Sequence, residues 1–142
     1  MPGKRVDTLD YLAKVPLFSA CSKRDLDRIS KASDQITVPA GQILVDQGDA
    51  GRDCYVVVEG TATVRRNGRK IATLGPGSVI GELSLLDHGP RTATVLADTD
   101  MVLLVIDQRH FAGLIDTVPA LAHKLLAYLA ARVRDFDRQA YG

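Results

Sequence analysis

The sequence of 142 residues predicts a mainly β fold, an antiparallel jelly-roll barrel (a double-stranded β-helix) with short N-terminal helices and a long C-terminal helix. Residues 36 to 107 alternate short strand-forming runs with Gly and Pro, and no helical pattern separates these runs. Helical periodicity is confined to the segments before and after them. The length suits one domain, residues 1–142, with a core of its own.

Residues 1–33 predict a helical arm. Residues 8–12 and 22–32 have the composition and spacing of short helices. Ser22 is a suitable N-cap, because Asp25 follows three residues later in the arrangement of a capping box. Leu17 and Phe18 lie between the two helices and are expected to dock the arm onto the rest of the domain.

Residues 34–107 predict the barrel. Residues 61–65 and 70–74 form two strand-like runs on either side of Asn67-Gly68, a pair of residues that both tolerate positive φ and so favour a tight hairpin. Residues 101–106 are continuously apolar, which is unlike a surface strand and predicts a buried one.

Residues 108–140 predict the C-terminal helices. Asp107 is expected to cap a short helix over residues 108–115. Pro119 suits the first position of a last helix that runs to about residue 138.

The last helix has two apolar rows. The first row has heptad spacing and consists of Ala122, Leu126, Leu129, Val133 and Phe136. The second row consists of Leu121, Leu125, Tyr128 and Arg132. Either both rows pack on the barrel, or one row faces a partner helix while the other covers a ligand.

Composition and charge are those of an ordinary soluble domain. The net charge of +1 lacks the basic excess of a protein that binds duplex nucleic acid. The first residues are not followed by the apolar run of a signal peptide, so none is expected. No apolar run in the sequence approaches the length of about 18 residues that spans a membrane. Cys21 and Cys54 are expected to be reduced thiols, so a cytoplasmic location is expected.

Residues 81–93 have the features of an anion site. Gly81 opens the stretch, and residues 82–86 predict one short helical turn whose free amides would face an anion. After a turn, Arg91 enters a strand-like run and carries a permanently charged planar fork. Glu82 would repel an anion unless its carboxylate faced a hydroxyl donor such as a ribose 2′-OH. An anion site at the start of a short helix, beside a carboxylate suited to a ribose hydroxyl, predicts a small nucleotide as the ligand.

This stretch resembles the phosphate-binding cassette of the cyclic nucleotide-binding domain family. The matching positions are Gly81, Glu82, Leu83, Ser84, Leu85, Arg91, Thr92 and Ala93, with the gap between Glu and Arg intact. One departure is Ile80, where an aromatic residue is usual. Residues 39–44, 47–49, 55–60 and 75–77 also resemble the family, so the resemblance extends from about residue 17 to about residue 134.

The resemblance implies that the chain binds cyclic AMP or cyclic GMP and that its last helix closes over the base and often pairs in a dimer. The implied ligand-binding residues are Gly81, Glu82, Leu83, Ser84, Arg91, Thr92 and Ala93, with Tyr128 and Arg132 as candidates for stacking on the purine. Two alternatives stay open at single positions. Arg91 could form a structural salt bridge with Glu82, and Thr92 could simply be a strand residue.

Catalysis has little support in the sequence. The histidines 88, 110 and 123 fall in unrelated segments and form no metal-type cluster, and no nucleophile motif is present. We therefore predict a non-enzymatic regulatory module without metal or cofactor, a stand-alone sensor of a cyclic nucleotide. Only about four residues follow the last helix, so we expect no DNA reader and an output through a second copy or another protein. Because no apolar run is long enough to span a membrane, no membrane partner is expected either. The alternatives are a ligand-free scaffold and a sensor of another small anion.

Overall fold

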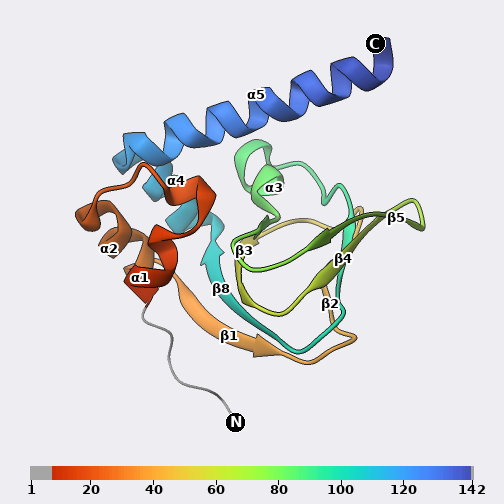
Figure 1. The fold of residues 1–142 in the computed structure, drawn as a ribbon, viewed down its shortest axis with the longest axis horizontal. Helices are drawn as coiled ribbons and strands as arrows, with labels where there is room; N and C mark the ends of the chain where they lie inside the picture. Colours follow the sequence, from red (N-terminus) through yellow and green to blue (C-terminus); the bar gives the residue numbers. More distant parts are fainter. Residues whose placement is uncertain (1–7, 142) are drawn as a thin grey trace.

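The computed structural model describes residues 8–141, and within them two four-stranded antiparallel sheets form the barrel (Figure 1). The first sheet has the order β1-β8-β3-β6, and the second has the order β2-β7-β4-β5. The strands are β1 Asp34–Val38, β2 Ile43–Val45, β3 Asp53–Glu59, β4 Ala62–Arg66, β5 Arg69–Leu74, β6 Val79–Ile80, β7 Thr94–Ala97 and β8 Met101–Asp107. Together with the flanking helices, they confirm the predicted fold class.

The N-terminal arm consists of α1 (Thr8–Ala13), the 3₁₀ turn η1 (Pro16–Phe18) and α2 (Lys23–Lys31). The predicted capping box is present: Ser22 and Asp25 each accept a hydrogen bond from the other's backbone N–H. These two bonds satisfy amides that a helix start leaves free, which is why α2 begins directly after Ser22.

The predicted hairpin joins β4 to β5. Asn67 and Gly68 have φ values of 53° and 78°, as a two-residue turn of type I′ requires. The strands lie within a residue of the predicted ranges.

Two apolar cores share strands β3 and β8. Inside the barrel, Val57 and Leu103 are fully buried. On the opposite face of the same strands, Val56 and Leu104 pack against the helices. Because side chains alternate between the two faces of a strand, a strand between two cores is apolar at nearly every position. This arrangement explains the continuous apolar run over residues 101–106.

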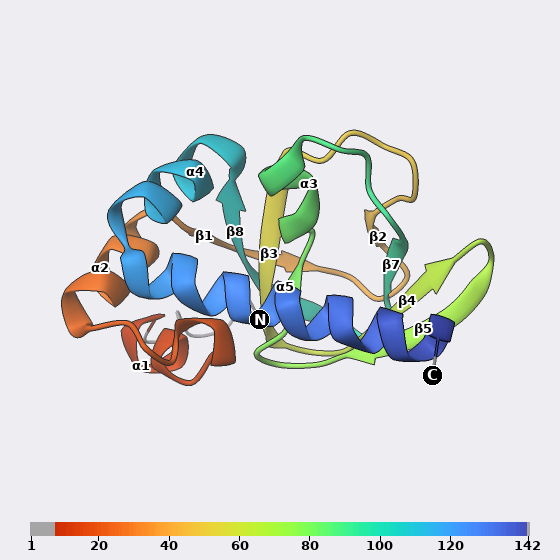
Figure 2. The same cartoon turned by 90° about the horizontal axis from the view of Figure 1, so that it is seen from above.

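The C-terminal helices are α4 (Gln108–Thr117) and α5 (Pro119–Tyr141). Asp107 caps α4 as predicted, because its carboxylate accepts a hydrogen bond from the backbone N–H of His110 at 2.8 Å. Figures 1 and 2 show α5 crossing the molecule from α4, past α3 (Glu82–Asp87), to the side of the β4–β5 hairpin. Both helices extend slightly beyond their predicted ends.

The two rows on α5 have different environments. Leu121 and Leu125 of the second row are buried against the helical core, whereas Tyr128 and Arg132 of that row are more exposed. In the first row, Leu126 and Val133 are each 66% exposed. The alternative in which both rows pack on the barrel is therefore wrong for Leu126 and Val133, whereas Leu129 of the same row is partly buried against the helical core. The side chain of Phe136 lies outside the described part of the chain.

No helix in residues 8–141 is by itself long and apolar enough to cross a membrane; α4 and α5 reach that length only as a pair bent by 105°. Cys21 and Cys54 are free thiols, as expected.

Candidate functional site

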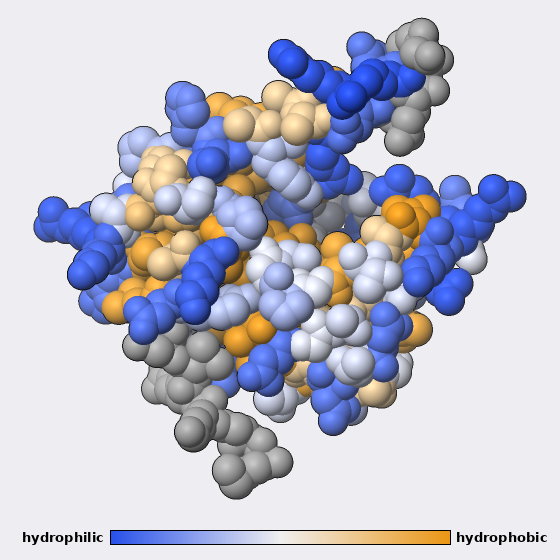
Figure 3. Space-filling model, in the orientation of Figure 1, coloured by the Kyte–Doolittle hydropathy of each residue, from blue (hydrophilic) through white to orange (hydrophobic). Residues whose placement is uncertain are grey.

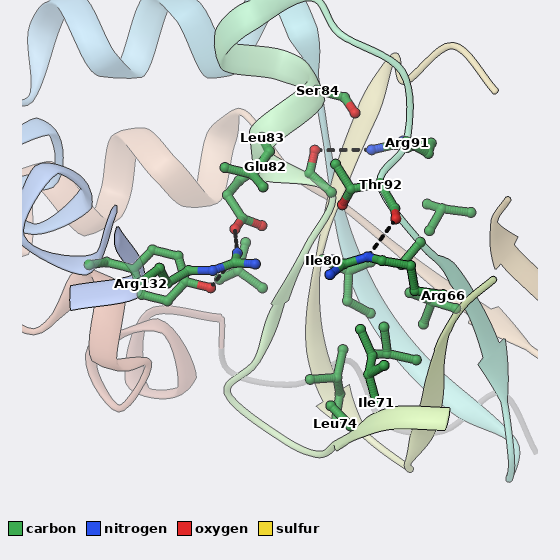
Figure 4. Close-up of a pocket in the computed structure, with 18 residues that line it drawn as sticks. Arg66, Ile71, Leu74, Ile80, Glu82, Leu83, Ser84, Arg91, Thr92 and Arg132 are labelled. Atoms are coloured by element: carbon green, nitrogen blue, oxygen red, sulfur yellow. Dashed lines mark hydrogen bonds and ion pairs between the residues drawn. The ribbon is translucent and has the colours of Figure 1, made fainter. Parts of the chain in front are cut away.

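A cavity of about 260 Å³ lies between the 81–93 segment, the β4–β5 hairpin and α5 (Figure 4). In the space-filling view, a hollow lies below the C-terminal half of α5 and beside the hairpin (Figure 3). The structure places all nine predicted site residues around this cavity: Gly81, Glu82, Leu83, Ser84, Arg91, Thr92, Ala93, Tyr128 and Arg132. The cassette residues thus meet two α5 residues that lie 35 to 51 positions further along the chain.

The local fold of the cassette depends on Gly81. Strand β6 pairs with β3, and the chain then turns into α3 through Gly81, whose φ is 85°. A Cβ atom at this position would collide with the Arg91 guanidinium. Only glycine combines this left-handed backbone with so close an approach. The preceding Ile80 is buried in the barrel core.

Arg91 is held rigidly at the inner end of the cavity. Its side chain is only 7% exposed, and its Nη1 and Nη2 donate to the backbone carbonyls of Gly81 at 3.0 Å and Asp53 at 2.6 Å. The Gly48 N–H donates to the Arg91 carbonyl, and the Arg91 N–H donates to the Asp49 carbonyl, each at 2.8 Å. Contacts within the protein therefore fix both the backbone and the guanidinium of Arg91.

The alternative of an Arg91–Glu82 salt bridge is not realised. Within residues 8–141, Arg91 forms no ion pair with a carboxylate, and Glu82 pairs instead with Arg132. A second correction concerns the strand after the turn. Arg91, Thr92 and Ala93 precede β7, which begins at Thr94. The Arg91 backbone is hydrogen-bonded to Gly48 and Asp49 instead, and the Thr92 carbonyl accepts from the Arg66 side chain.

Glu82 lies at the other side of the cavity, beneath α5. It is 4% exposed, and its Oε1 lies 3.6 Å from Nη1 of Arg132. Burial raises the pKa of Glu82 above its usual value, and the Arg132 guanidinium and the Tyr128 hydroxyl oppose this rise. The Arg132 guanidinium lies over the Tyr128 ring at 5.7 Å from its centroid, an arrangement typical of a cation–π contact. The structure thus places the two α5 residues predicted to stack on a base against Glu82.

The sequence interpretation missed two residues that shape the site. A Cβ atom on Gly51 would lie 2.5 Å from Cβ of Ser84 and 2.8 Å from Cζ of Arg91, so glycine is needed for the loop to pass behind the cassette. Arg66, at the end of β4, lines the cavity and donates from Nε to the Thr92 carbonyl at 3.0 Å. No local signal identifies either residue, because both contacts join segments far apart in the chain.

An apolar wall completes the cavity. It is formed by Val45, Val64, Ile71, Ala72, Leu74, Val79, Ile80 and Val95. A fixed cation, the N-terminus of α3, a carboxylate and an apolar wall together suit a small ligand that combines an anion, a hydroxyl and a flat apolar ring. In the part of the chain that the structure describes, no three His, Cys, Asp or Glu side chains converge as a metal site.

Comparison with known proteins agrees with this geometry. The family model "Cyclic nucleotide-binding domain" matches residues 35–118. The chain is 35% identical over 127 residues to the Cyclic AMP receptor protein of Thermus thermophilus, covering 86% of this chain and 59% of that protein. It is also 35% identical over 105 residues to a cAMP-dependent protein kinase regulatory subunit of Schizosaccharomyces pombe, covering 73% of this chain and 26% of that protein.

A solved structure has the same fold. The Catabolite Activator Protein of Thermus thermophilus superposes with a TM-score of 0.83 at 35% identity, over 88% of this chain and 61% of that one. The chain thus spans less than two thirds of the relatives it matches. These relatives are named as receptors, activators or regulatory subunits, in keeping with a regulatory binding module. With its family model matched across the whole barrel, the chain belongs to the cyclic nucleotide-binding domain family.

Proposed function

We propose that this domain senses a cyclic nucleotide, cyclic AMP or cyclic GMP, in the cavity described above, and signals through its last helix. Arg91 and the N-terminal amides of α3 would hold the cyclic phosphate, and the Glu82 carboxylate would accept a hydrogen bond from the ribose hydroxyl. The observation that carries the proposal is a buried guanidinium that faces a cavity and, within the described residues, has no carboxylate partner. A buried cation is unfavourable unless an anion compensates it, and a phosphodiester would do so.

The names of the relatives support the same ligand class, since one is a receptor for cyclic AMP and another is the regulatory subunit of a kinase that depends on it. A ligand-free scaffold is less well supported. Burial of Glu82 raises its pKa, so keeping this group ionised at neutral pH destabilises the folded domain. A scaffold gains nothing from such a residue, whereas a ribose site needs an acceptor there.

The proposed output begins at Glu82. The Glu82 carboxylate faces Arg132 of α5 at 3.6 Å. A ribose hydroxyl would share this carboxylate, and a base would contact Tyr128 on the same face of α5. The ligand would therefore alter the contacts that Arg132 and Tyr128 make beneath α5. This change would shift the population between two positions of the helix.

The proposed partner is a second copy of the chain. Ala122, Leu126, Leu129 and Val133 follow heptad spacing along α5, and two of these side chains are largely exposed. A row of this kind suits a parallel or antiparallel helix pair. Pairing would join the movement of one α5 to that of the other.

The test of ligand binding is isothermal titration calorimetry with cyclic AMP and cyclic GMP on the wild type and on Arg91→Ala and Arg91→Lys. Charge-assisted hydrogen bonds contribute about 1.5–3 kcal/mol each, so Arg91→Ala is expected to weaken binding on the order of 10–100-fold. Arg91→Lys keeps the charge but loses the planar fork, and an intermediate affinity is expected.

The control is Arg65→Ala, an exposed arginine that does not line the cavity. Thermal unfolding of each variant shows whether it is folded. Equal and negligible heats for wild type and both Arg91 variants, with all three folded, would refute the proposed function.

A further inference from the structure

The cavity has three arginines and one carboxylate. Arg91 lies at its inner end, Arg132 comes from α5 and Arg66 comes from the hairpin, whereas Glu82 supplies the single negative charge. Glu82 pairs with Arg132, and Arg91 would pair with the phosphate of the proposed ligand. A cyclic phosphodiester carries one negative charge, so Arg66 remains as a cation without a counterpart. Among the described residues, Arg66 forms no ion pair.

The Arg66 side chain is exposed to solvent, but it reaches along the cavity that it lines. Its Nε donates to the Thr92 carbonyl at 3.0 Å, which ties the side chain across the cavity from the hairpin to the cassette. Figure 4 shows the guanidinium between Thr92 and Ile71, pointing into the cavity. With Nε engaged, the two terminal nitrogens remain as a pair of parallel donors.

The surroundings of this donor pair are apolar. Ile71, Ala72 and Leu74 of β5 form the adjacent wall and offer no side-chain acceptor. Guanine presents two acceptors, O6 and N7, along one edge, which match the fork of an arginine. Adenine presents N7 beside an amino group. Because the amino group is itself a donor, it cannot accept the second hydrogen bond of the arginine fork.

We infer that Arg66 is a specificity-determining residue of the site and that it selects cyclic GMP over cyclic AMP. The inference rests on the proposed function and specifies its ligand. A matched bidentate contact discriminates between bases by about 1–3 kcal/mol, which corresponds to roughly 5–150-fold in affinity.

The test is calorimetry with cyclic GMP, cyclic AMP and cyclic IMP on the wild type, Arg66→Ala and Arg65→Ala. Cyclic IMP keeps O6 and N7 but lacks the 2-amino group of guanine, so it isolates the edge that Arg66 would contact. Arg65 is the matched control, because it is the neighbouring exposed arginine of the same strand and does not line the cavity. Arg66 is exposed, so its replacement is expected to leave the fold intact, which thermal unfolding checks.

We expect wild type to bind cyclic GMP and cyclic IMP about 10-fold more tightly than cyclic AMP. Arg66→Ala is expected to remove this preference by weakening the first two ligands, and Arg65→Ala to leave all three affinities unchanged. Equal weakening of all three ligands by Arg66→Ala would assign Arg66 to the phosphate and overturn the inference. Tighter binding of cyclic AMP by the wild type would overturn it as well, while leaving the proposed function intact. Absence of binding for all three ligands would overturn both.

Discussion

Glu82 is the residue at which binding and stability oppose each other. Its carboxylate is buried under α5, where loss of hydration is only partly compensated by Arg132 at 3.6 Å. The net result is a raised pKa, so the folded domain holds a proton more tightly than the unfolded chain does. Stability therefore falls as the pH rises from the ordinary value of 4.5 through the raised pKa.

We expect Glu82→Gln to raise the thermal stability of the nucleotide-free domain at pH 7, because the glutamine is neutral at every pH and keeps the shape of the side chain. The gain should shrink as the pH is lowered toward 4.5 and below, where the wild-type carboxylic acid is also neutral in both states. The same variant should bind cyclic nucleotides more weakly, because a ribose hydroxyl loses its charged acceptor. Melting curves and titrations between pH 4 and 8 measure both effects.

The exposed Glu59 at the end of β3 is the control for this prediction. Glu59→Gln should change neither the melting temperature at pH 7 nor its pH profile by a comparable amount. A Glu82→Gln variant that is less stable than wild type at pH 7 would show that the pair with Arg132 outweighs the desolvation of the carboxylate.

At the scale of single elements, α5 performs two separate tasks along its length. Its first turns fix the helix to the domain through Leu121 and Leu125, which are buried where α5 packs against η1 and α4. The following turns carry Tyr128 and Arg132 over the cavity, with Leu126 and Val133 toward solvent. A helix held at one end and free along one face is suited to change its position when a ligand enters.

We therefore expect leucine replacements on the two faces of α5 to differ sharply. Leu121→Ala should lower the free energy of unfolding by about 2–5 kcal/mol, because it leaves a cavity in the core. Leu126→Ala should change it by less than about 0.5 kcal/mol in the monomer, as for other exposed positions. Urea unfolding at low protein concentration measures both values.

Leu126 also provides a test of dimer formation through α5. Light scattering at high micromolar concentration should detect a dimer of the wild type and a monomer of Leu126→Lys. A wild type that stays monomeric with and without nucleotide would remove the proposed self-association, while the difference in stability between the two alanine variants would still be expected.

For the whole molecule, the shared strands β3 and β8 make the two cores interdependent. Cys54 on β3 is 1% exposed, and burial, with smaller contributions from neighbouring charges, raises its pKa to about 12. Reaching this thiol requires separation of β3 from the helices or from β8. Local opening of the β4–β5 hairpin would not expose it, because the hairpin packs against the other core.

Labelling of Cys54 should therefore report global unfolding. In the Cys21→Ser variant, which leaves Cys54 as the remaining thiol, we expect reaction with an aromatic disulfide reagent at pH 8 to be slower by orders of magnitude than in denaturant. In the Cys54→Ser variant, the half-buried Cys21 should react much faster. Cys54 labelling that is as fast as Cys21 labelling would mean that the barrel opens without unfolding as a whole.

Local patterns predicted those parts of the protein that depend on neighbours in the chain. The capping box at Ser22, the Asn67-Gly68 turn, the Asp107 cap and the strand-to-helix step at Gly81 each arise from the backbone preferences of a few successive residues, and each was confirmed. The eight matching positions of residues 81–93, with the gap from Glu82 to Arg91 intact, were sufficient to identify the family. The continuous apolar run over residues 101–106 indicated a buried strand, and β8 is one.

The sequence by itself thus determined the elements, their order and the family, because periodicity, caps and turn residues act over a few positions. Only the tertiary structure decided the pairing of charges. Glu82 faces Arg132 rather than Arg91, Arg66 reaches Thr92 across the cavity, and Gly51 makes room for the Arg91 guanidinium. Each of these contacts joins segments that are distant in the chain, and it depends on how the hairpin, the cassette and α5 come together around one cavity.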